Sequence, residues 1–89
     1  MTRMAQEWVQ MLGFAAGTMT TAAFVPQVVK TWRSRSASDI SLGMYAVLTC
    51  GVFSWLAYGL LVGDWPVVAA NGVTLVLVAA MLAMKLVFR

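Results

Sequence analysis

The sequence predicts a small all-α membrane protein with three transmembrane helices, from its composition and from the spacing of its charges. Of 89 residues, 62% are hydrophobic and 10% are charged, whereas soluble domains average about half and a quarter. Three long runs carry no charged side chain: 8–29, 40–63 and 65–84. Each reaches the roughly 20 residues needed to cross the hydrocarbon core of a bilayer. We therefore expect one domain, residues 1–89, with helices at about 8–31, 41–62 and 66–86.

The first predicted helix has one small and polar face and a proline near its end. That face recurs at steps of three and four residues and consists of Gln10, Gly13, Gly17, Thr20, Phe24 and Gln27. Pro26 removes one helical hydrogen bond and clashes with the carbonyl four residues back, so we expect a kink. At membrane depth a kink is tolerated only beside other helices or a water-filled cavity. The segment therefore either bends within a packed bundle or faces a polar space.

The connection between the first two helices, residues 32–39, is predicted to be a polar, mobile linker, and Asp39 is predicted to cap the next helix. Basic residues gather at this end of the bundle: Lys30, Arg33, Arg35, Lys85 and Arg89. The opposite end holds only Arg3. By the positive-inside rule, the linker and the C-terminus are cytoplasmic and the N-terminus is outside.

The second and third helices are joined by a tight turn at residues 63–66, in which Asp64 is suited to cap the third helix. Trp55 precedes Asp64 by nine residues and Asn71 follows it by seven. At 1.5 Å per residue, both lie roughly 10–13 Å below the turn on adjacent helices. An aromatic ring beside an amide suits a neutral polyhydroxylated solute, because the ring packs on C–H groups and the amide bonds to hydroxyls. The alternative for Asn71 is a simple interhelical hydrogen bond.

A single copy cannot enclose such a solute. Three packed helices leave a gap only about 1 Å in radius, whereas a ring of six leaves a space about one helix wide. We therefore expect a homodimer whose two-fold axis runs along the membrane normal.

Several classes of protein are disfavoured because the sequence lacks the residue types that they need. The chain has no histidine, one cysteine (Cys50) and no acidic residue at mid-membrane. We expect no enzymatic activity, no metal, no cofactor and no nucleic-acid partner, and no proton coupling through a buried acid. A cleavable signal peptide is disfavoured by Glu7 and by the apolar run that continues to Val29.

Four short motifs in order resemble those of a bacterial SemiSWEET sugar transporter of the PQ-loop superfamily. They are Pro26-Gln27 with Lys30-Thr31, Ser41-x-x-Met44-Tyr45, Trp55-x-x-Tyr58-Gly59 and Asn71-x-Val73-Thr74-Leu75. The resemblance implies that the third helix packs between the first and second, and that two parallel copies form a six-helix homodimer in the bacterial inner membrane. It also implies uniport of a sugar of the glucose or sucrose class by alternating access.

The resemblance also implies roles for individual residues. Trp55 and Asn71 match the substrate pair, with Thr20 and Phe24 as further substrate-binding candidates. Further roles follow the motifs: Tyr58 and Asp64 match an outer gate, Met44 and Tyr45 an inner gate, and Pro26 and Gln27 a hinge. Gly72 departs from the pattern, because a branched apolar residue is more usual there. The alternative function is a small non-transporting membrane assembly or regulatory subunit, which needs only helix packing.

Overall fold

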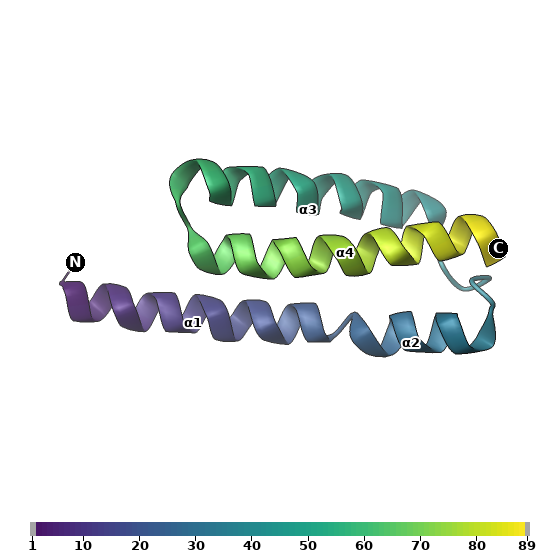
Figure 1. Ribbon diagram of the computed structural model, residues 1–89, viewed down its shortest axis with the longest axis horizontal. Coiled ribbons are helices and arrows are strands. Elements are labelled where there is room, and N and C mark those ends of the chain that lie inside the picture. The colour runs from purple at the N-terminus through teal and green to yellow at the C-terminus, as the bar shows by residue number, and fades with distance from the viewer. Residues whose placement is uncertain (1, 89) are drawn as a thin grey trace.

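The computed structural model describes residues 2–88, which form four helices and no strand. Their bounds are α1, Arg3–Ala22; α2, Val25–Ser34; α3, Leu42–Val62; and α4, Trp65–Phe88. α1 and α2 lie end to end as one bent span (Figure 1). The chain thus has three spans that are long and apolar enough to cross a membrane. The predicted all-α, three-span fold is confirmed, although the first helix begins at Arg3 rather than near Trp8.

α4 lies between the α1–α2 span and α3 and packs against all three helices (Figure 1). The predicted arrangement is confirmed, because the third span lies between the first and the second. The protomer is 50 Å long, which exceeds the ~30 Å hydrocarbon core. We call the end that carries the α3–α4 turn the turn end, and the end that carries Lys30 and Lys85 the basic end. Arg89, predicted to add to the basic end, lies outside the described residues.

The contact between α1 and α4 depends on two glycines. A Cβ atom at Gly13 would lie 3.0 Å from Pro66 Cβ, and one at Gly17 would lie 2.6 Å from Ala70 Cβ. Small residues let membrane helices approach this closely. One turn further along α1, the hydroxyl groups of Thr21 and Thr74 are hydrogen-bonded at 2.7 Å. α1 is therefore fixed to α4 along its second half.

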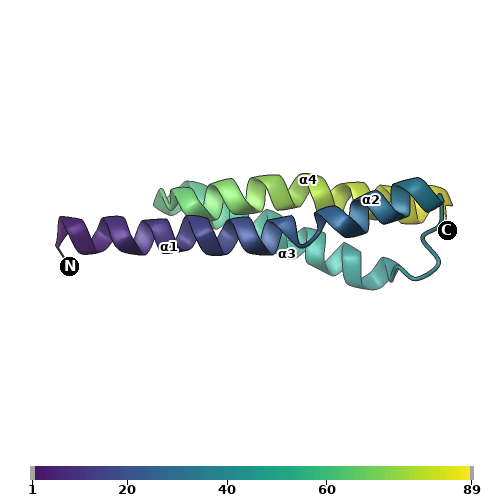
Figure 2. The same ribbon diagram turned by 90° about the horizontal axis from the view of Figure 1, so that it is seen from below.

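The span bends between α1 and α2, at Ala23 and Phe24, just before Pro26 (Figure 2). Pro26 has no N–H, and its ring would clash with the carbonyl of Ala22 four residues back. The last turn of α1 tightens instead, because the Phe24 N–H donates to the Thr21 carbonyl at 3.1 Å. The helix resumes where the Val28 N–H donates to the Phe24 carbonyl at 3.0 Å.

The buried core lies in the half of the bundle nearer the basic end. It consists of Ala37, Ile40, Tyr45, Val52, Val78, Met81 and Met84. The turn-end half lacks such a core among the described residues and is hollowed on one side. The protomer is therefore better packed in its basic half than in its turn-end half.

The linker at the basic end is anchored at Ala37, whereas its other residues, including Arg33 and Arg35, are exposed. Ala37 is fully buried, and Lys85 Nζ donates to its carbonyl at 3.0 Å. The Arg35 guanidinium lies 4.0 Å from the centroid of the Trp32 ring and 5.5 Å from that of Phe88. The prediction of a solvated linker therefore holds for its arginines and is corrected at Ala37, which packs on the core and accepts the bond from Lys85.

The cap of α3 is also corrected, because Ser41 rather than Asp39 occupies the capping position. Ser41 Oγ accepts the Met44 N–H at 3.1 Å. A capping side chain must directly precede the first helical residue to reach that N–H. Asp39 is too early, because the buried Ile40 stands between it and Ser41.

Candidate functional site

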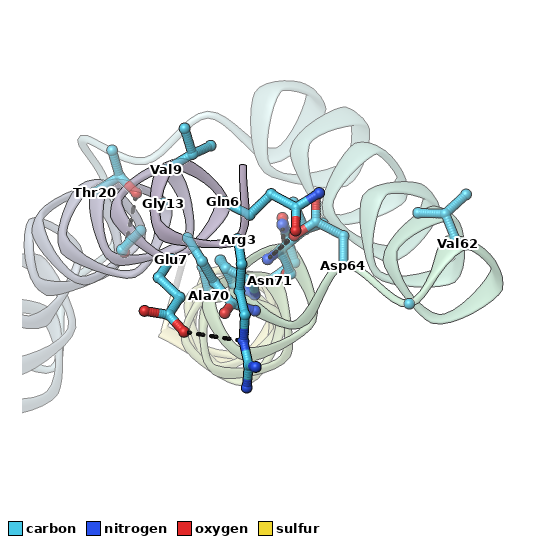
Figure 3. Close-up of a pocket in the computed structure, with 15 residues that line it drawn as sticks. Arg3, Gln6, Glu7, Val9, Gly13, Thr20, Val62, Asp64, Ala70 and Asn71 are labelled. Carbon is cyan, nitrogen blue, oxygen red and sulfur yellow. Dashed lines mark hydrogen bonds and ion pairs between the residues drawn. The ribbon is translucent and has the colours of Figure 1, made fainter. Parts of the chain in front are cut away.

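A groove of about 920 Å³ opens between α1, the α3–α4 turn and the first half of α4. Its polar side chains come from all three segments: Gln6, Gln10, Thr20, Asp64 and Asn71. Figure 3 shows Gln6, Asp64 and Asn71 around this space, together with the Arg3–Glu7 ion pair at its rim. Three of the predicted site residues, Thr20, Asp64 and Asn71, therefore share one groove.

Asn71 presents an incompletely bonded amide to the groove. Its Nδ2 atom donates to the Val67 carbonyl at 3.0 Å. Its Oδ1 accepts no hydrogen bond within residues 2–88. Thr20 Oγ1 donates to the Gly17 carbonyl at 3.1 Å, so its lone pairs also stay available as acceptors. The groove thus offers both donors and acceptors without a free positive charge beside Asn71.

Asp64 belongs both to the groove and to the start of α4. Its Oδ1 accepts the Val67 N–H at 3.3 Å, and its carbonyl accepts the Val68 N–H at 3.0 Å. Gly63 precedes it at φ 73°, a left-handed conformation that glycine adopts without strain. The predicted cap is present, and it holds the Asp64 carboxylate at the mouth of the groove.

Trp55 lies at the same depth as Asn71, on the neighbouring helix. A Cβ atom at Gly59 would lie 2.9 Å from Val67 and 3.1 Å from Val68, which sets the register of α3 against α4. Trp55 lies one turn deeper than Gly59 on α3, and Asn71 lies one turn deeper than Val67 on α4. The predicted common level therefore holds in the structure.

The Trp55 ring does not line the groove but lies on the open face of α3. Trp55 is 56% exposed and Tyr58 is 50% exposed. Their rings meet edge to face, with centroids 5.5 Å apart. Val62, one turn beyond Tyr58 on the same face, does line the groove. This aromatic pair therefore adjoins the groove, and in a single protomer nothing among the described residues covers it.

The predicted inner gate and hinge residues lie in the basic half. The Tyr45 hydroxyl donates to Gln27 Oε1, which ties α3 to α2. Tyr45 is buried, whereas Met44, its neighbour, is exposed. Phe24 packs against the core at the bend, directly before Pro26. The structure brings Phe24, Gln27 and Tyr45 close to the bend, and away from the groove.

Two sets of contacts were not predicted from the sequence. Thr21 and Thr74 form the buried hydroxyl pair between α1 and α4. Arg35 and Lys85 hold the linker against the last turns of α2 and α4. For Gly72, an added Cβ atom would meet no atom within 4 Å, so packing within the protomer does not require a glycine there.

Together these features define a class of protein: a small integral membrane protein of three spans, with a polar groove that is open on one side. The PQ-loop repeat family matches residues 8–68. A sugar transporter SemiSWEET of Bradyrhizobium diazoefficiens is 51% identical over 78 residues, which cover 88% of this chain and 91% of that protein.

Solved structures agree with the sequence comparison. A bacterial homologue of SWEET transporters superposes with a TM-score of 0.87 at 34% identity, over 92% of this chain and 99% of that one. A SemiSWEET in the inward-open conformation superposes with a TM-score of 0.84 at 42% identity. The match covers 91% of this chain and 87% of that one. The chain belongs to the PQ-loop repeat family and, within it, to the SemiSWEET proteins. These named relatives are transporters, so the prediction that the chain is not an enzyme is confirmed.

Proposed function

We propose that the protein is a facilitative sugar transporter, a uniporter that works by alternating access as a parallel homodimer. The observation that carries the proposal is the common depth of Trp55 and Asn71. The ring is half exposed and the amide is open on its oxygen side. A second copy facing this side would enclose both groups, and a sugar between the copies would meet a ring and an amide from each.

The bend at Ala23–Phe24 gives one protomer a means to open and close. Thr21, bonded to Thr74 and to the Ala70 carbonyl, holds the end of α1 in place. α2 begins only after the bend and is held at the basic end by the bond from Tyr45 to Gln27. Opening the basic end therefore requires that α2 turn at the bend and that this bond break.

We infer uniport because no acidic side chain lies at mid-membrane. Asp39 precedes α3, and Asp64 caps α4 at the turn end. Proton relays in membranes use ionisable groups within the spans. By the positive-inside rule, the turn end faces outward and the basic end faces the bacterial cytoplasm.

The test is uptake of radiolabelled glucose and sucrose into proteoliposomes by the wild type and by Asn71→Ala. We expect uptake by the wild type and a loss of at least about tenfold in the variant, because the amide bonds directly to the solute. Val76→Ala, an exposed position on the same helix, is the matched control and should transport normally. No uptake of either sugar by an intact wild-type dimer would instead favour the non-transporting assembly or regulatory subunit.

A further inference from the structure

The first turns of α1 project beyond the rest of the protomer at the turn end (Figure 1). Gly13 packs against Pro66, at the second residue of α4, so the residues before Gly13 have no α4 beside them. This projecting part has two faces. One is apolar and exposed and contains Met4, Trp8, Met11 and Leu12. The other lines the groove and contains Arg3, Gln6, Glu7 and Gln10.

The groove-lining face continues the line of residues that leads to Asn71. Gln6, Gln10, Gly13, Gly17 and Thr20 follow one another at steps of three and four, and all line the groove. Gly17 packs against Ala70, the residue beside Asn71. Gln10 stands seven residues before Gly17, which places it about 10 Å above the level of Asn71 along the helix.

Gln6 and Gln10 are the polar residues of this projecting segment whose side chains have no bonding partner among the described residues. Arg3 and Glu7 pair with each other at 3.8 Å. The side-chain amides of Gln6 and Gln10 make no hydrogen bond within residues 2–88. Each amide offers two donors and an acceptor without a charge. That set of groups suits the hydroxyls of a neutral solute, as the Asn71 amide does one level deeper.

We propose that Gln6 and Gln10 form a second solute subsite, which binds hydroxyl groups of the part of a sugar that projects from the Trp55 and Asn71 level toward the turn end. This inference rests on the proposed function. Gln10 lies about 10 Å, and Gln6 about 16 Å, along the helix from the level of Asn71, so one sugar ring cannot reach both levels. The second subsite therefore acts on a solute of two rings and leaves a single ring nearly unaffected.

The experiment is equilibrium binding of glucose and sucrose to the purified dimer by titration calorimetry, with wild type and Gln10→Leu compared. Losing one or two neutral hydrogen bonds should raise the Kd for sucrose about three- to tenfold. The Kd for glucose should stay within about twofold, because its ring binds one level deeper. Gln6→Leu should act in the same direction, and the double variant should exceed either single one.

Met11→Leu is the matched control, since Met11 lies on the opposite, apolar face of the same turn; it should change neither Kd. Equal weakening of both sugars, or no weakening of sucrose, would overturn the second subsite while leaving the transporter in place. The second subsite would also be overturned if the wild type bound glucose but did not bind sucrose. Binding of neither sugar by the wild type would remove the proposed function itself, which is a separate and visible result.

Discussion

Polar side chains within the spans fall into two groups: those bonded inside the protomer and those left open. The hydroxyls of Thr21 and Thr74 bond to each other, and the Tyr45 hydroxyl donates to Gln27 Oε1. Asn71 is only half satisfied, and the Trp55 ring is half exposed. Because an open amide at membrane depth is costly, the proposed function assigns the second group to contacts with the solute or the partner copy. The first group marks what holds the protomer in shape.

The Thr21–Thr74 pair can be tested as a structural contact by a double-mutant cycle. Thr21→Val and Thr74→Val each keep the branched shape and remove the hydroxyl. Interhelical hydrogen bonds in membranes contribute about 0.6 kcal/mol on average, and up to about 1.7 kcal/mol. We expect a coupling free energy in that range from thermal or denaturant unfolding in detergent. Additive losses of stability would show that the two hydroxyls do not depend on each other.

At the scale of elements, the bend between α1 and α2 divides a fixed segment from a movable one. α1 is held by close packing at Gly13 and Gly17, where no side chain fits. α2 is held chiefly by side chains at its buried face and at its end, including Thr31 and Trp32. Side-chain contacts break and re-form more readily than a tight backbone approach, so motion is expected on the α2 side of the bend.

Pro26→Ala tests the bend. The variant regains an N–H that can bond to the Ala22 carbonyl, so α1 and α2 can join into one continuous helix. The protein should fold and dimerise normally. Its maximal uptake rate should fall about two- to tenfold if a restored bond of ~0.5–1.5 kcal/mol must break in each cycle. Val25→Ala, at the adjacent position, serves as control in the same proteoliposome assay, and an unchanged rate in Pro26→Ala would count against the hinge.

The elements also show what the sequence could and could not predict. The short turn at Gly63 and Asp64 fixes the register of α3 against α4, so the common level of Trp55 and Asn71 was predictable by counting residues. No such turn joins α1 to α4. Their register depends on where Gly17 meets Ala70. The Thr21–Thr74 bond could therefore not be predicted from the sequence. The anchoring of Ala37 was not predicted, because it depends on Lys85, 48 residues further along the chain.

At the scale of the whole molecule, one protomer supplies half of the proposed solute site. Its basic half has a core, and its turn-end half has a groove with exposed aromatic rings beside it. Large apolar side chains such as Phe53 and Leu60 are also exposed along α3, and lipid or a second copy must cover them. The ring of six helices provides a path only if both protomers contribute to it. Function should therefore depend on both copies of each solute-binding residue.

Mixing wild-type protomers with Asn71→Ala protomers tests this dependence. At equal amounts, random pairing leaves about one quarter of the dimers fully wild type. If the path is shared and needs both amides, uptake per total protein should fall to about that quarter, because the mixed dimers also lack one amide. Differently tagged protomers, purified in sequence, allow the mixed dimer to be measured alone. Uptake that falls only to half, with the mixed dimer half active, would mean that each protomer carries its own path.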